Sequence, residues 1–458
     1  MKTNNNSNGA AGFDLVQPIV EIVEHLLKGL IKLLSWAVPL LVKRILNRPE
    51  AAHVIEMKAL TSRKQTNHPD ALGVDTETRK TVLLKDINFI SHSFIVGASG
   101  FGKTNLISIL QEHSLKNGIP VIFFDPKGDL LALNTFLDLC ETHKRTCYVF
   151  SEFYKGSVRL NPLLEGTANQ VADRIMQAFD WSEQYYKDVA FRSLLRALKD
   201  LERAGRDFSL KNIHERLQEN PNEKDIVGLL AKLESILESD FSPLLNGTKE
   251  DLTISKIWEE GACLYLGLST QGYGETARSI GKLFLEELLY NSYRSLRGTT
   301  GGWASEFRPV SVFFDEFGAV VTPEFIELQN KCRGAGMQLT MAVQTAADID
   351  RIDPALTSQI IENASNIFVM KQRLDAGASL FADAIGTVIS KKETYATEDG
   401  EKSGRGSTTQ SNSYQSHPQL IKNLNVGQCV LLQHSPTRVR LINIRKRKTD
   451  YMSFQRNA

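Results

Sequence analysis

Hydrophobic positions in this chain fall into short apolar runs separated by longer segments with helical periodicity. The runs are aliphatic or aromatic and mostly lack polar alternation, which is typical of strands that a parallel sheet buries on both faces. Helical segments between such strands indicate right-handed crossovers, so the pattern predicts a doubly wound α/β core with a mostly parallel sheet. The predicted core strands are 93–96, 120–124, 146–150, 263–266, 310–314, 338–343 and 366–370, with closing strands at 428–433 and 439–444.

Two segments interrupt this alternation. Residues 167–245 contain repeated helical patterns and no convincing strand, so we expect an all-helical insertion domain there. Residues 391–417 are rich in Ser, Thr, Gly, Gln and Lys and almost lack apolar residues, which predicts a mobile polar loop. The α/β core would then comprise 81–166 and 246–448, with linker and edge structure at 48–80 and a C-terminal tail at 449–458.

The N-terminal region has a different pattern from the core. Residues 1–12 are rich in Asn and Gly, which predicts a disordered leader. From 13 to 47 apolar residues recur at steps of three and four, which predicts an amphipathic helix. Its longest uncharged stretch, 33–42, contains Pro39 and is shorter than the roughly 20 apolar residues that a bilayer span needs. Docking on a membrane surface or on a partner is therefore favoured over packing within the chain and over a true span.

The composition indicates a globular protein but does not identify what the protein binds. Of the 458 residues 42% are hydrophobic, which is ample for a buried core. Lys and Arg together number 54 against 53 Asp and Glu, so any attraction for nucleic acid must come from local patches. The five cysteines include no CxxC pair, which argues against a zinc site or a redox dithiol and favours buried thiols in a reducing cytosol.

Residues 97–104 carry the most specific signal. They read GASGFGKT, which fits the Walker A pattern GxxxxGK[ST], and they lie between an apolar strand and a predicted helix. In that setting backbone N–H groups surround the phosphates, Lys103 reaches the β and γ phosphates, and the Thr104 hydroxyl binds Mg²⁺. We therefore predict ATP and Mg²⁺ as cofactors. The predicted binding residues are Gly97, Ala98, Ser99, Gly100, Phe101, Gly102, Lys103 and Thr104.

A second signal follows the predicted strand 310–314. The strand ends in the acidic pair Asp315 and Glu316, as a Walker B motif does. Asp315 would hold Mg²⁺ through water, and Glu316 would polarise the attacking water. The alternative is that the two acids are only the solvated end of a strand, which the Walker A motif upstream disfavours. A Glu after the Asp, and the lack of a guanine-reading NKxD sequence, favour ATP hydrolysis over a GTPase switch.

Two further residues are candidates for catalysis, each with a structural alternative. The strand 338–343 delivers Gln344 to the carboxyl edge of the sheet, where it would sense the γ-phosphate unless it merely ends the strand. Arg333 ends a predicted helix just before Gly334 and Gly336. It would act on a neighbouring subunit's phosphates as an arginine finger, or else stabilise the C-terminus of its own helix.

Six motifs follow one another along the chain: GASGFGKT at 97–104, DPKGD at 125–129, LNPL at 160–163, FDEFG at 314–318, RGAG at 333–336 and VQT at 343–345. Together they resemble the motifs of the TraD/TraG/TrwB-type coupling ATPases of conjugation and type IV secretion. The order of the motifs narrows the superfamily to FtsK, HerA and coupling-protein motors, and the resemblance runs from about residue 70 to 445.

The resemblance implies a RecA-like fold and a hexameric ring that pulls DNA through a central pore. It also implies that 167–245 corresponds to the family's all-α domain, which faces the relaxosome or substrate, and 391–417 to the polar loop before the final strands. The chain departs from the family at its N-terminal end. Coupling proteins usually carry two transmembrane helices there, whereas this chain has one amphipathic segment.

We therefore expect an ATP-hydrolysing DNA translocase that delivers relaxosome DNA to a conjugative type IV secretion apparatus at the cytoplasmic face of the inner membrane. The expected partners are DNA, further copies of the chain, and relaxosome or secretion-channel proteins. Membrane association would use residues 13–47 or a membrane partner. Two alternatives remain open: a HerA- or FtsK-like cytoplasmic DNA motor, and a secretion ATPase that handles protein substrates.

Overall fold

A computed structural model describes residues 52–447, except residues 90, 220–225, 249, 298–308 and 399–400. The predicted leader at 1–12, the predicted amphipathic helix at 13–47 and the predicted tail at 449–458 lie outside the described residues. Within the described part of the chain, every helix is too short or too polar to cross a bilayer.

Within the described residues the core is an eleven-stranded sheet, seven strands of which run parallel. Each predicted core strand overlaps one of them, which confirms the mostly parallel α/β fold. In spatial order the parallel strands are β9 (Ala364–Val369), β3 (His92–Val96), β8 (Met337–Val343), β7 (Val310–Phe314), β4 (Val121–Asp125), β6 (Cys263–Gly267) and β5 (Cys147–Phe150).

Four antiparallel strands extend the sheet beyond β9. The two predicted closing strands are both present, and the predicted edge structure at 48–80 contains β1. In order outward from β9 the added strands are β12 (Gln428–His434), β13 (Thr437–Ile444), β1 (Ala71–Asp75) and β2 (Thr81–Leu83). Short 3-10 helices occur at η1 (Met57–Thr61), η2 (Leu84–Asp86) and η4 (Phe317–Ala319).

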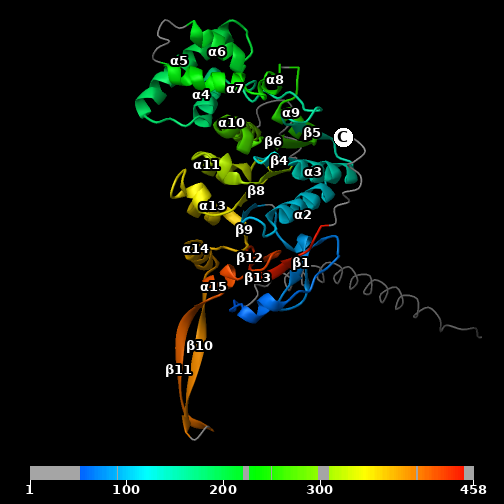
Figure 1. Cartoon of the computed structure of the whole chain (residues 1–458), viewed down its shortest axis with the longest axis vertical. Coiled ribbons are helices and arrows are strands. Elements are labelled where there is room, and N and C mark those ends of the chain that lie inside the picture. The colour runs from blue at the N-terminus through cyan, green and yellow to red at the C-terminus, as the bar shows by residue number, and fades with distance from the viewer. Residues whose placement is uncertain are drawn as a thin grey trace, which may run out of the picture. The chain divides into compact units, whose positions relative to one another are not determined.

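Helices cover both faces of the sheet, which explains why its central strands lack polar alternation. Successive side chains of a strand point to opposite faces. Phe123 packs on Phe136 of one face, with ring centroids 5.8 Å apart, while Phe124 packs on Phe314 of the other, at 4.6 Å. Figure 1 shows the two layers of helices. One layer is α2 (Lys103–Lys116) and α3 (Leu130–Thr142); the other is α10 (Thr270–Arg297), α11 (Phe325–Cys332), α13 (Leu356–Asn363) and α14 (Asp375–Ile385).

Between β5 and β6 the described residues of 167–245 contain helices and no strand. The first of these helices begins with a capping box, in which the side chains of Thr167 and Gln170 each accept a hydrogen bond from the other residue's backbone N–H. Its helices are α4 (Ala168–Ala178), α5 (Gln184–Arg203), α6 (Leu210–Gln218), α7 (Val227–Leu237) and α8 (Ser242–Leu245). Helix α9 (Ile254–Glu260) then leads into β6, and α12 (Ala347–Asp350) follows β8.

The segment 391–417, predicted as a mobile loop, is instead mostly a β-hairpin of β10 (Thr387–Glu398) and β11 (Glu401–Tyr414). Helix α15 (Pro418–Lys422) follows it. The prediction was wrong because it equated the lack of an apolar face with the lack of regular structure. Two antiparallel strands satisfy each other's backbone N–H and C=O groups whether or not one face is buried.

Shortening this hairpin should leave the rest of the fold intact, because β10 and β11 pair only with each other. We expect replacement of 391–410 by an Asn-Gly turn, which joins the paired residues Ser390 and Ser411, to change the melting temperature by no more than about 4 °C. Differential scanning fluorimetry of both proteins measures this. A larger loss of stability would show that the hairpin is part of the folded core.

Candidate nucleotide site

The strand order brings distant motifs to one edge of the sheet. Strand β8 lies between β3 and β7, and β4 lies on the far side of β7. Since these strands are parallel, all of their carboxyl ends meet at the same edge. The segment after β3 begins at Gly97, Asp315 follows β7, Gln344 follows β8 and Asp125 ends β4.

The Walker A segment forms a tight loop between β3 and α2. Its first residue is fixed by a hydrogen bond from the Gly97 N–H to the Val343 carbonyl, at 3.2 Å. A Cβ atom at Gly97 would lie 2.5 Å from the Cβ of Met370, so the loop requires glycine there. Gly100 and Gly102 adopt φ values of 82° and 104°, which are accessible at little cost to glycine alone.

The loop ends with the residues that would hold the phosphates and the metal ion. Lys103 is buried at the start of α2, and its Nζ donates to the Gly97 carbonyl at 2.7 Å, across the loop. Burial lowers the pKa of Lys103, although Glu316 and Asp315 oppose this shift. Thr104 is exposed in the first turn of the helix. A hydroxyl and a carboxylate are hard oxygen donors, which Mg²⁺ prefers, so Thr104 and Asp315 form a donor set that fits the ion.

The two Walker B acids differ in burial and in backbone conformation. The Asp315 side chain is 3% exposed, and its Oδ1 accepts the N–H of Glu316 at 3.0 Å. Glu316 has φ 44° and ψ 48°, a left-handed conformation that is uncommon for a residue with a side chain. Gln344 Nε2 donates to Glu316 Oε1 at 2.9 Å. The structure therefore brings together Glu316 and Gln344, which sequence reasoning had proposed separately.

Lys127, in the turn after β4, contacts both Walker B acids. Its Nζ lies 3.0 Å from Asp315 Oδ2 and 2.9 Å from Glu316 Oε1. Burial would lower the pKa of Lys127, but the two carboxylates together raise it. Burial would likewise raise the pKa of Glu316, but hydrogen bonds from Lys127 and Gln344 hold it below its ordinary value. Sequence reasoning gave Lys127 no role, although a lysine two residues after a core strand was a usable signal.

Behind Lys127, a buried tyrosine and carboxylic acid support the turn. Tyr265 Oη donates to Asp125 Oδ2 at 2.6 Å. Burial raises the pKa of Asp125 to about 6, although the bond from Tyr265 opposes this. On the solvent side, a cavity of about 220 Å³ opens beside Lys127, Glu316 and Gln344.

Arg333 does not join the other candidate residues. It follows α11 and precedes β8, and its charge acts on His92, the first residue of β3. It therefore lies toward the amino ends of the strands, whereas Gly97 and Asp315 follow the carboxyl ends. An exposed side chain at that edge has no direct route to the nucleotide site of its own chain.

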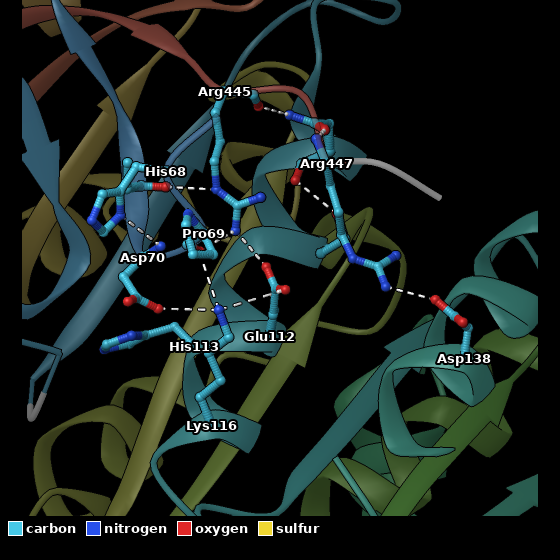
Figure 2. A network of polar contacts seen from close by, with 12 residues as sticks. His68, Pro69, Asp70, Glu112, His113, Lys116, Asp138, Arg445 and Arg447 are labelled. Atoms are coloured by element: carbon cyan, nitrogen blue, oxygen red, sulfur yellow. Dashed lines mark hydrogen bonds and ion pairs between the residues drawn. The ribbon is translucent and has the colours of Figure 1, made fainter. Parts of the chain in front are cut away.

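Two arginines that follow β13, Arg445 and Arg447, contact helices α2 and α3, as Figure 2 shows. Arg445 donates to Glu112 of α2 and, at 2.7 Å, to the Ala71 carbonyl, while Arg447 donates to Asp138 of α3 at 2.7 Å. Asn105, next to Thr104, pairs with the backbone of both arginines. Both arginine side chains are buried and paired within the chain, so they are not part of an exposed basic patch.

Comparison with known families identifies two regions of the chain. Residues 309–427, which contain Asp315, Glu316, Arg333 and Gln344, match the family described as the TraM recognition site of TraD and TraG. Residues 74–163, which contain the Walker A loop and Lys127, match the central domain of helicase HerA. No curated protein sequence matches the chain.

Solved structures share the fold at low sequence identity. The plasmid coupling protein TrwB in complex with ADP and Mg²⁺ has a TM-score of 0.61 at 14% identity, over 88% of this chain and 90% of that chain. TrwB with the non-hydrolysable ATP analogue ADPNP gives 0.62 at 13% identity, over 88% and 95%. VirB4 of Thermoanaerobacter pseudethanolicus gives 0.54 at 13% identity, over 85% and 99%. The chain therefore shares the fold of TrwB and VirB4, and two of its regions resemble the TraD/TraG and HerA families.

Proposed function

We propose that the chain hydrolyses ATP as a homohexameric motor that delivers relaxosome DNA to a conjugative type IV secretion apparatus. The observation that carries the coupling role is the match of 309–427 to the TraM recognition site of TraD and TraG. It covers the whole stretch from Walker B to α15. The ring would work at the cytoplasmic face of the inner membrane, attached through residues 13–47 or through a membrane partner.

The geometry of the site supports a separate role for each residue in hydrolysis. The loop 97–104 would surround the phosphates with its N–H groups, and Lys103 would neutralise their charge. Thr104 and Asp315 would hold Mg²⁺, which supplies further charge neutralisation when bound. Glu316 would orient the attacking water, and Gln344 would hold Glu316 and sense the γ-phosphate. The nucleotide is ATP in this proposal because Glu316 follows Asp315 and the sequence lacks a guanine-reading NKxD motif; TrwB itself is solved with ADP, with ADPNP and with the GTP analogue GDPNP.

Two other functions have observations in their favour. The match of 74–163 to the HerA central domain favours a cytoplasmic DNA motor that acts outside conjugation. The structural likeness to VirB4 favours a secretion ATPase that handles protein, with the helices between 167 and 245 as the receptor. Relaxase and mating-pore genes beside this gene would favour the coupling role over both.

Addition of DNA should stimulate ATP hydrolysis by the purified protein, because a translocase couples turnover to movement along its substrate. The rate is measured with single-stranded and with double-stranded DNA at low and high salt, alongside the mass in solution, and Lys103→Ala provides the background. We expect stimulation that declines with salt and a mass of six chains in the presence of DNA. If neither form of DNA binds or changes the rate at low salt, the protein-handling alternative is favoured.

Lys103→Ala and Glu316→Gln should both abolish hydrolysis but differ in nucleotide binding. The first removes a phosphate contact and the bond to the Gly97 carbonyl, whereas the second leaves the phosphate loop intact. Turnover should fall by about 100-fold or more in each. Equilibrium binding of a fluorescent ATP analogue separates them, with affinity lost only in Lys103→Ala. Equal loss of binding in both would contradict the role given to Glu316.

Arg333→Ala tests whether the ring completes its sites between subunits. If Arg333 serves a neighbour's site, the variant should bind ATP and lose turnover by about 10³-fold or more, as arginine fingers do. Mixed with Lys103→Ala protein, it should regain part of the activity, because some interfaces then pair an intact loop with an intact arginine. The absence of any recovery in proven mixed rings would leave Arg333 as the residue that ends α11.

A further inference from the structure

Lys127 bridges the two Walker B carboxylates. Its ammonium lies 3.0 Å from Asp315 Oδ2 and 2.9 Å from Glu316 Oε1, so these two oxygens cannot be more than 5.9 Å apart. One donor group at hydrogen-bond distance from both carboxylates restrains the position of each relative to the other.

The contacts on Glu316 leave one of its oxygens for a water molecule. Lys127 Nζ and Gln344 Nε2 both lie 2.9 Å from Oε1. Among the described residues, no donor contacts the other carboxylate oxygen, Oε2. Two donors on one carboxylate oxygen fix the orientation of the whole group, so the direction in which Oε2 points is set by Lys127 and Gln344 together.

The turn that carries Lys127 is held from both sides. The Asp125 carboxylate accepts the N–H of Lys127 at 3.0 Å and that of Asp129 at 3.2 Å. On the other side, the N–H and the hydroxyl of Thr270 donate to the Pro126 carbonyl at 2.7 and 2.8 Å. Such a turn presents the ammonium from a fixed point, unlike a lysine on a free surface loop.

Glycine at position 128 lets this turn approach the next loop closely. Gly128 has φ 59°, and a Cβ atom there would lie 2.2 Å from Ser269 Oγ and 3.0 Å from the Ser269 backbone nitrogen. The 126–129 turn and the loop at Ser269 are therefore in direct contact, and any larger residue at 128 must push them apart.

From this geometry we infer that Lys127 is a positioning residue for ATP hydrolysis, which orients the Glu316 carboxylate toward the attacking water rather than binding the nucleotide. The inference rests on the ATPase function proposed above. It separates Lys127 from Lys103: both are lysines of the site, but only Lys103 lies in the phosphate loop.

Lys127→Met tests this directly, because it keeps a long side chain and removes the ammonium. We expect turnover to fall by about 100-fold, the cost of a misplaced catalytic group, while the KM for ATP and the affinity for ADP stay within about threefold. Lys127→Arg should regain part of the turnover, since it restores a cation with donors. Lys331→Met, which removes a lysine paired with Glu327 on the surface of α11, is the matched control and should behave as wild type.

A readout other than turnover separates positioning from a structural role. ADP with Mg²⁺ and aluminium fluoride mimics the transferring phosphoryl group, and its stable trapping needs an ordered water and catalytic carboxylate. We expect wild type, Lys331→Met and, in part, Lys127→Arg to trap ADP. Lys127→Met should bind ADP, melt within a few degrees of wild type, and fail to trap it.

Gly128→Ala provides a second variant that leaves the lysine in place. The added methyl group must displace the turn from Ser269, so turnover should fall without loss of ADP binding. Gly205→Ala is its control, because Gly205 has a similar φ of 66° but open space around the added Cβ. Both variants carry the same backbone strain, and only the first should change turnover.

Three results would overturn the inference. Unchanged turnover in Lys127→Met would show that Glu316 is oriented without Lys127. Increased turnover would show that Lys127 inhibits hydrolysis by holding Glu316. Loss of ADP binding in proportion to turnover would make Lys127 a nucleotide ligand. In all three cases wild type hydrolyses ATP and Lys103→Ala does not; a wild type without hydrolysis would instead refute the proposed function, and this inference with it.

Discussion

The insertion of β8 between the Walker A strand β3 and the Walker B strand β7 is the constraint on which the site depends. Backbone hydrogen bonding fixes the spacing of the strands, and parallel direction places their carboxyl ends together. With β8 in the middle, Gln344 is delivered between the phosphate loop and Glu316, where it bonds the carboxylate at 2.9 Å. With β4 beyond β7, the turn after β4 reaches the same carboxylates from the other side.

Two lysines and two acidic residues of the site offset each other's charge. Lys103 and Lys127 face Asp315 and Glu316, and both lysines favour a lower pKa for Glu316. Partial burial strengthens these interactions relative to water. The same balance makes each charge sensitive to removal of its partner, because a lone charge of this kind would be left poorly solvated.

The site is also tied to parts of the chain that lie outside the phosphate loop. Arg445, which follows β13, contacts Glu112 of α2 (Figure 2). Asn105 of α2 donates to the Arg445 carbonyl at 2.9 Å, and the first turn of α2 carries Lys103 and Thr104. On the other face, α10 begins with Thr270, which bonds the Lys127 turn. Beyond a kink at Gly274, the α10 residues Glu275 and Thr276 meet Lys232 and Ser235 of α7 in the helical insertion. The segment α10 therefore contacts the turn beside the Walker B acids on one side of this kink and the insertion on the other.

Local sequence alone predicts the core strands, the helices of 167–245 and the Gly-rich loop at 97–104. Each of these features follows from a local pattern: an apolar run, a 3.6-residue period, or glycines at the spacing that a phosphate loop requires.

Contacts between segments that are distant in the sequence become visible only in the folded structure. Lys127 meets Glu316 across 189 positions of sequence, and no local pattern predicts that contact. The basic residues Arg445 and Arg447 are buried only because Glu112 and Asp138 lie opposite them. The hairpin at 387–414 forms because two polar segments complete each other's backbone hydrogen bonds, a property that hydropathy does not record. Arg333 lies toward the edge opposite its own phosphate loop because a helix that precedes a parallel strand ends at the amino edge of the sheet, where the next strand begins.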